Sequence, residues 1–170
     1  KTMTSLNPTH SLADVIVIGA GIAGASVAWW LAPHAKVVLL ERESQPGYHS
    51  TGRSAAMFIE TYGTPAIRAL TRASRAFYEH PPEGFTEHSL LAPRGAMMVA
   101  TPEQLPELDA HWAMLAPINP QAQRLSAAEA IVRVPVLRPE CVAGAVYEPD
   151  AADMDVHAIH QGFLRGVRSH

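Results

Sequence analysis

Hydrophobic residues follow two patterns at the start of the chain. Val15–Ile18 is an unbroken aliphatic run, which is typical of a parallel strand covered on both faces. From Gly21 the apolar residues recur at helical spacing, and Pro33 ends the predicted helix. A second aliphatic run spans Lys36–Leu40. Strand, helix and strand within about thirty residues predict a βαβ unit with a right-handed crossover.

The pattern becomes mixed from about residue 62. Thr64-Pro65 can start a helix, because the hydroxyl caps it and proline suits its first turn. Ile67 and Leu70 mark the apolar face of this helix, and Arg75 lies on its polar face, which is expected to be solvated. Ser126 and Glu129 have the spacing of a capping box. The elements predicted in this region are helices that begin after Thr64, Thr101, Ser126 and Asp155, and strands at residues 96–100 and 144–148.

A glycine-rich turn joins the first strand to the first helix. Gly19, Gly21 and Gly24 form a G-x-G-x-x-G run, and Glu41 ends the second strand twenty positions after Gly21. Such glycines allow a tight turn, a close approach of the backbone to a pyrophosphate, and close helix packing. The carboxylate can accept hydrogen bonds from ribose hydroxyls and disfavours a 2′-phosphate. The motif predicts a dinucleotide site but does not distinguish FAD from NAD.

Composition and charge exclude several other classes of site. The net charge of −3 and the absence of a basic patch interleaved with aromatic residues argue against nucleic acid as a partner. Cys141 is the only cysteine, so no internal disulfide is possible. His157 and His160 could share a helix face, but no third metal ligand has suitable spacing, so no metal is expected. Lys1–Ala13 is polar and unlike a signal peptide, which favours a cytoplasmic protein.

The segment Gly47–Ala56 carries a resemblance that covers nearly the whole chain. With the motif at residues 14–41, it resembles the D-amino-acid oxidase/glycine oxidase superfamily of FAD-dependent oxidoreductases, and within it the bacterial D-arginine dehydrogenases. The likeness continues through Tyr62–Pro65, Leu90–Arg94 and His160–Gly162. It implies FAD as the cofactor and a two-domain flavoenzyme, of which this α/β chain would be the N-terminal half.

The resemblance implies where the two domains lie. Residues 14–61 and 150–170 would form an incomplete Rossmann-type FAD-binding domain. Residues 62–149 would form an incomplete portion of a mixed α+β substrate domain. The remainder of the polypeptide would be the missing partner of both, and the 170-residue piece alone is expected to be inactive.

The resemblance also implies a set of binding residues. Those matching the ADP half of FAD and the segment that wraps the flavin are Gly19, Gly21, Ala23, Gly24, Glu41, Arg42, Ser50, Thr51, Gly52, Arg53, Ser54, Ala55, Ala56 and Met57. Those facing the substrate are Met57, Tyr62 and Ala96. No catalytic acid or base is assignable, because the flavin performs the chemistry and the protein orients the substrate.

The implied reaction is oxidative deamination of a D-amino acid to a 2-oxo acid and ammonia. Met57 stands where the D-arginine enzyme has a histidine, and Ala96 stands where it has a glutamate that faces the substrate guanidinium. Without that carboxylate, neutral or apolar D-amino acids are expected to be preferred over D-Arg.

Two alternatives to this reaction stay open. One is a flavin amine oxidoreductase acting on glycine, sarcosine or a 2-hydroxy acid, and the other is a non-catalytic NAD-binding sensor module. The electron acceptor, whether oxygen or a quinone, and a peripheral membrane association of the full-length protein are also left open.

Overall fold

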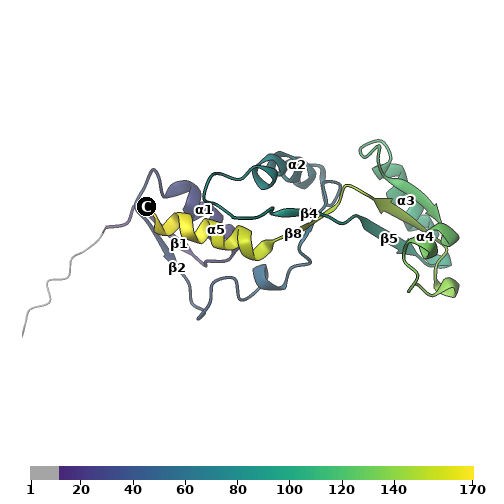
Figure 1. The fold of residues 1–170 in the computed structure, drawn as a ribbon, viewed down its shortest axis with the longest axis horizontal. Coiled ribbons are helices and arrows are strands. Elements are labelled where there is room, and N and C mark those ends of the chain that lie inside the picture. Colours follow the sequence, from purple (N-terminus) through teal and green to yellow (C-terminus); the bar gives the residue numbers. More distant parts are fainter. Residues whose placement is uncertain (1–11) are drawn as a thin grey trace, which may run out of the picture. The chain divides into compact units, whose positions relative to one another are not determined.

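The computed structural model describes residues 12–170, so most of the polar stretch before Asp14 lies outside the described residues. The chain forms two compact units (Figure 1). Unit 1 comprises the residues up to Ser54 together with Glu83–Glu87 and Val156–His170, and unit 2 comprises Ala55–Pro82 and His88–Asp155. The units divide the chain after Ser54 and after Asp155, because residues 57–58 pair with residues 152–153 in one sheet of unit 2.

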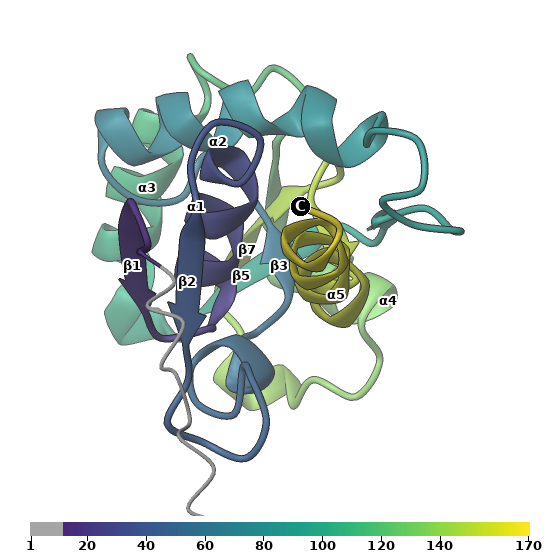
Figure 2. The same ribbon diagram turned by 90° about the vertical axis from the view of Figure 1, so that its left-hand side faces the viewer.

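Unit 1 contains the predicted βαβ unit. Strand β1 (Val15–Ile18) and strand β2 (Val37–Leu40) pair in parallel, and α1 (Ile22–Leu31) connects them. The last helix, α5 (Val156–Arg168), packs against α1. Figure 2 shows the two strands side by side with both helices near them. A 3₁₀ turn, η1 (Thr51–Arg53), lies in the loop after β2.

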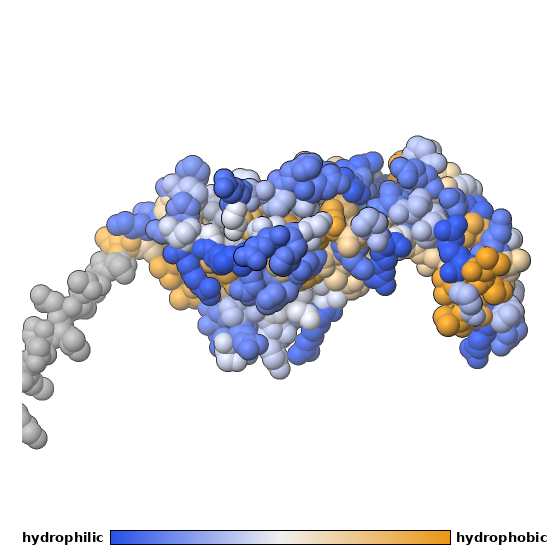
Figure 3. All heavy atoms as spheres, viewed as in Figure 1, coloured by the Kyte–Doolittle hydropathy of each residue, from blue (hydrophilic) through white to orange (hydrophobic). Residues whose placement is uncertain are grey.

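One face of the β1–β2 sheet is uncovered, contrary to the expectation that both faces would be buried. Ile16 is 60% exposed and Ile18 is 86% exposed, whereas Val15 and Val17 are partly covered. Val38 and Leu40 continue the exposed face on β2. The aliphatic run has the composition of a strand buried on both faces, but no described element covers this second face. Figure 3 shows hydrophobic surface in the region where Figure 1 labels β1 and β2.

An aromatic cluster holds α1 and α5 together in unit 1. The ring of Trp29 on α1 meets those of Phe85 and Phe163 edge-on, with centroids 5.9 and 5.6 Å away, and the two phenylalanine rings are 5.1 Å apart. Phe85 is 4% exposed. This burial explains why Glu83–Glu87 returns to unit 1, since aromatic rings supply large buried areas.

Unit 2 contains two three-stranded antiparallel sheets in the orders β3-β8-β4 and β5-β7-β6. The strands are β3 (Met57–Phe58), β4 (Leu91–Pro93), β5 (Ala96–Ala100), β6 (Gln123–Ser126), β7 (Gly144–Glu148) and β8 (Ala152–Met154). The helices are α2 (Pro65–Glu79), α3 (Leu105–Leu115) and α4 (Ala127–Arg133), with 3₁₀ turns η2 (Pro102–Gln104) and η3 (Pro139–Cys141).

The predicted helix starts are present in unit 2. Ser126 and Glu129 form the expected capping box, in which the Glu129 carboxylate accepts from the Ser126 N–H at 2.8 Å. The α3 residues Leu108 and Leu115 are buried against Val146 of β7. Among residues 12–170, no helix is long and apolar enough to cross a membrane.

Helix α2 departs from its expected amphipathic burial. Ile67 and Leu70, predicted for its apolar face, are 47% and 66% exposed. Arg75, predicted for a solvated face, pairs with Glu60 and Glu79 and lies over the ring of Phe58 at 4.9 Å. The charged face therefore contributes contacts between α2 and the rest of unit 2, and Tyr78 adds an edge-on contact with the same Phe58 ring.

Replacing Gly162 of α5 with alanine tests the aromatic cluster. A Cβ at this position would lie 2.6 Å from the Phe85 ring, which Trp29 and Phe163 hold in place. Alanine gains about 1 kcal/mol of helix propensity, but overpacking costs about 1–3 kcal/mol. We expect Gly162→Ala to lower the melting temperature and exposed Arg168→Ala to leave it unchanged. A Gly162→Ala protein that melts higher would contradict this packing.

Candidate functional site

The glycine-rich turn brings the start of α1 close to the end of β1. Gly19 has a φ of +97°, which favours glycine, and its N–H donates to the Leu40 carbonyl at 2.7 Å. A Cβ on Gly24 would collide with the Gly19 carbonyl oxygen. Glycine at position 24 therefore lets the helix backbone pack directly on the turn, the role that the spacing predicts.

The Glu41 carboxylate points at this turn. Its Oε2 accepts from the Ala20 N–H at 2.9 Å, and its Oε1 accepts from the N–H groups of Arg42 at 2.7 Å and Glu43 at 2.9 Å. The backbone N–H of Glu43, followed by that of Ala20, holds the pKa of the Glu41 carboxyl below its ordinary value of 4.5. The carboxylate is thus ionised and fixed beside the first residues of the turn.

The loop after β2 folds back onto the same turn. The Thr51 Oγ1 accepts from the Ile22 N–H at 2.9 Å, and a Cβ on Gly21 would lie 3.2 Å from that oxygen. The Gly52 N–H donates to the Gly47 carbonyl at 2.8 Å, which closes the loop. Thr51, predicted as a flavin-binding residue, is therefore also a capping residue for α1, a role that the sequence did not reveal.

Three N–H groups at the start of α1 are left for an anion. Among residues 12–170, those of Gly21, Ala23 and Gly24 have no hydrogen-bond partner, whereas that of Ile22 is satisfied. A helix N-terminus is suited to bind a pyrophosphate when its N–H groups are free and glycine stands where the backbone approaches the ligand most closely. The residues present therefore fit the ADP half of a dinucleotide.

The other residues expected to contact the cofactor lie exposed after β2. Arg42 pairs with Glu43 and its side chain is 86% exposed, and the Arg53 guanidinium lies 5.2 Å from the Tyr48 ring centroid. Ser50, Gly52, Ser54 and Ala55 are also exposed. Ala56 is the one non-glycine residue among residues 12–170 with a positive φ, at 53°. Such strain clusters at ligand sites, and here it falls in the segment predicted to wrap the flavin.

Unit 2 contains a cavity of about 520 Å³ that brings the three predicted substrate residues together. Met57 comes from β3, Tyr62 from the loop that follows it, and Ala96 from β5. Tyr62 is 75% exposed. Sequence reasoning missed several other lining residues, which are Ile59, Thr61, Arg94, Met97, Met98, His111 and Glu148. The alternation of β5 could have indicated Met98, which lies on the same face of the strand as Ala96.

A buried carboxylate forms part of the cavity wall. Glu148 is 8% exposed, and its Oε2 accepts from the Thr61 hydroxyl at 2.5 Å and from the Asn119 amide at 3.2 Å. The same Asn119 amide nitrogen donates to Asp150 at 2.9 Å. A buried carboxylate requires such donors. This network ties the segment before Tyr62 to strand β7.

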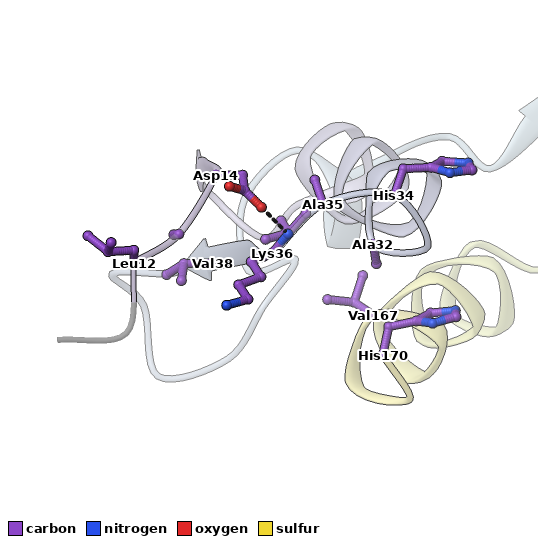
Figure 4. A pocket seen from close by; sticks show the side chains of 11 residues that line it. Leu12, Asp14, Ala32, His34, Ala35, Lys36, Val38, Val167 and His170 are labelled. Atoms are coloured by element: carbon purple, nitrogen blue, oxygen red, sulfur yellow. Dashed lines mark hydrogen bonds between the residues drawn. The ribbon is translucent and has the colours of Figure 1, made fainter. Parts of the chain in front are cut away.

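A second hollow, of about 520 Å³, lies at the other end of the parallel strands of unit 1. Figure 4 shows that it is bordered by residues near the starts of β1 and β2 and near the end of α5, where Asp14 accepts from the Lys36 N–H at 2.9 Å. Ligands of open α/β sheets bind beyond the carboxyl ends of the strands, so this hollow is not the nucleotide site. No cluster of three or more potential metal ligands is found in the part of the chain that the structure describes.

A family model for FAD dependent oxidoreductases matches residues 14–170. The chain belongs to this family. Its members depend on FAD and are oxidoreductases. The glycine-rich turn, with its N–H groups and Glu41, is the part of the described chain whose geometry suits the ADP half of that cofactor.

Relatives agree with this membership. The chain is 33% identical over 133 residues to an L-2-hydroxyglutarate dehydrogenase of Escherichia coli strain UMN026, covering 72% of this chain and 30% of that protein. Glycine oxidase from Geobacillus kaustophilus has a TM-score of 0.78 at 24% identity, over 92% of this chain and 44% of that one. For FAD-bound L-alpha-glycerophosphate oxidase from Mycoplasma pneumoniae the TM-score is 0.76 at 17% identity, over 92% and 42%. The chain thus spans less than half of these relatives.

Replacing Thr51 tests the contact between the loop and the turn. Thr51→Val removes the acceptor for the Ile22 N–H while keeping the side-chain shape, and Thr51→Ser keeps the acceptor. A lost hydrogen bond of this kind costs about 1 kcal/mol, so we expect Thr51→Val to weaken FAD binding about fivefold. Flavin fluorescence during titration of the apoprotein measures this. Equal affinities for the valine and serine variants would show that the hydroxyl has no role.

The lowered pKa of Glu41 predicts how the turn responds to acid. A carboxyl with a lower pKa in the folded state contributes stability above its unfolded value and loses it as the pH falls through the folded value. Because the shift is downward from 4.5, FAD retention should stay constant from about pH 7 to about pH 5 and fall below about pH 4.5. In the Glu41→Gln variant, FAD retention should be weak at every pH, and it should show no loss below about pH 4.5 that is due to protonation of this carboxyl. The fluorescence of released flavin measures FAD retention. A variant that loses FAD over the same pH range as the wild type would contradict the prediction.

Proposed function

We propose that the protein catalyses FAD-dependent oxidative deamination of D-amino acids and prefers neutral or apolar ones. The observation that carries this proposal is the cavity in unit 2 whose lining includes Met57, Tyr62 and Ala96 together. These are the positions at which the resemblance to D-arginine dehydrogenases places substrate contacts. The proposal concerns the full-length protein, and the substrate-domain role of unit 2 is part of it.

The chain's own residues hold the cofactor and the substrate. In this proposal the free N–H groups of Gly21, Ala23 and Gly24 bind the pyrophosphate, and Glu41 accepts from the ribose hydroxyls. The segment Ser50–Met57 wraps the flavin. FAD, when bound, would supply the acceptor for the hydride that leaves the substrate Cα as the amine loses a proton. Water then hydrolyses the resulting imino acid to a 2-oxo acid and ammonia.

The lining of the cavity favours neutral side chains. Ile59, Met97 and Met98 add apolar surface, and methionine adapts to ligands of varied shape. The charged residues of the wall are already partnered: Arg94 pairs with Asp153 at 2.5 Å, and Glu148 accepts from Thr61 and Asn119. A guanidinium seeks two carboxylate oxygens at once, and Glu148 Oε2 already accepts two donors.

A second candidate is oxidation of a 2-hydroxy acid, or of glycine or sarcosine. The relative of 33% identity is named for L-2-hydroxyglutarate, and a similar fold is that of a glycine oxidase. Hydride abstraction from Cα beside a hydroxyl is the same chemistry as beside an amine. No observation favours the NAD-binding sensor, since the match to an FAD-dependent family spans residues 14–170. A cytoplasmic location is part of the proposal, and the electron acceptor stays open.

A substrate panel with a charge insertion at position 96 tests the preference. The wild-type protein should have a higher kcat/KM for D-Met or D-Leu than for D-Arg. Because a carboxylate beside the cavity would attract a cation, Ala96→Glu should raise kcat/KM for D-Arg relative to D-Met about tenfold, as expected for a charged hydrogen bond of about 1.5 kcal/mol.

Ala96→Gln is the matched control, since it adds the same volume without the charge and should not raise the ratio. D-Arg as the best wild-type substrate would refute the preference for neutral side chains. Activity on 2-hydroxy acids with none on D-amino acids would favour the second candidate.

A further inference from the structure

The two histidines of α5 lie in different environments. His157 is exposed, whereas His160 is 4% exposed and lies inside unit 1. Sequence reasoning treated both as histidines without a ligand role. A buried imidazole must have partners for its ring nitrogens, and the partner of His160 identifies its role.

His160 makes its hydrogen bond to the glycine-rich turn. Its Nε2 lies 2.7 Å from the Ala20 carbonyl oxygen, across 140 positions of sequence. A carbonyl oxygen only accepts, so Nε2 carries the hydrogen and donates it. The Ala20 N–H donates to Glu41 on its other side. Two side chains from outside the glycine run therefore fix Ala20 at both its N–H and its carbonyl.

The bond from His160 also determines where the next N–H points. The peptide bond between Ala20 and Gly21 is trans, so the Ala20 carbonyl and the Gly21 N–H point in opposite directions. While His160 holds the carbonyl, the Gly21 N–H is directed away from the imidazole and has no partner among residues 12–170. Glycine at position 21 would otherwise let this peptide rotate at low cost, which would turn an oxygen toward the anion.

The His160 ring also supports the loop that follows β2. Gly47 has a φ of +81°, and a Cβ on it would lie 2.9 Å from the ring Cε1 and 3.2 Å from Nδ1. The Gly47 carbonyl in turn accepts from the Gly52 N–H. The ring thus contacts the loop beside Thr51 as well as the turn that Thr51 caps.

We propose that His160 is a positioning residue for the cofactor pyrophosphate. Its Nε2–H holds the Ala20 carbonyl so that the Gly21 N–H stays available as a donor to the phosphate oxygens. The inference rests on the proposed binding of FAD at this turn. It predicts that His160 affects ligands that carry a pyrophosphate and does not affect the adenosine part, which Glu41 would bind.

A pair of polar variants tests the proposal in the full-length apoprotein. His160→Gln places an amide donor near the position of Nε2, whereas His160→Asn is too short to reach the Ala20 carbonyl. Affinities for FAD, ADP and adenosine are measured by titration, together with the melting temperature. His157→Gln on the same helix is the control for a histidine substitution.

The Asn variant should bind FAD and ADP about tenfold more weakly, as expected for loss of one buried hydrogen bond, with adenosine affinity unchanged. The Gln variant and the His157→Gln control should bind all three ligands as the wild type does. Equal behaviour of the Asn and Gln variants, an equal loss for ADP and adenosine, or an Asn variant that does not fold would each overturn the positioning role. A wild-type protein that binds no FAD would refute the proposed function instead.

Discussion

The candidate nucleotide site depends on one close approach, that of the α1 backbone to the Gly19 carbonyl. Any Cβ at position 24 would occupy the space of that oxygen, so the approach exists only with glycine there. It places the first turn of α1 against the end of β1, where the free N–H groups and the positive end of the helix dipole face outward together. The carboxylate of Glu41 and the hydroxyl of Thr51 then bind to N–H groups within this turn.

The turn is held by segments that are far apart in the sequence. Glu41 ends the neighbouring strand, Thr51 belongs to the loop after it, and His160 lies on the last helix. Each satisfies one backbone group at the turn, and within the described part of the chain the N–H groups of Gly21, Ala23 and Gly24 keep no partner. A Gly-rich segment loses much conformational entropy on ordering, and these three contacts restrict it before any ligand binds.

Local sequence patterns predicted the parts of the fold that depend on local physics. The aliphatic runs, the glycine spacing and the Ser126–Glu129 capping box each act within a few residues, and each is present. Strands β3 and β8 were missed, because two- and three-residue strands have no periodicity and exist only through pairing across about ninety positions. The roles of Thr51 and His160 were missed for the same reason, since both act through long-range hydrogen bonds. Arg75 looked solvated because its partner Glu60 lies outside α2.

Two residues of the cavity wall lie on one pair of strands. Ala96 and Glu148 are directly opposite each other in the β5–β7 register, so their side chains share a face of the sheet. A carboxylate at position 96 would stand beside that of Glu148, and two like charges at this separation are costly unless a cation lies near them. Of these two positions only 148 has a carboxylate, and neutral donors from Thr61 and Asn119 stabilise it. These neutral donors occupy Oε2 of Glu148 without cancelling its charge, and a neutral side chain in the cavity would leave the Thr61–Glu148–Asn119 network intact.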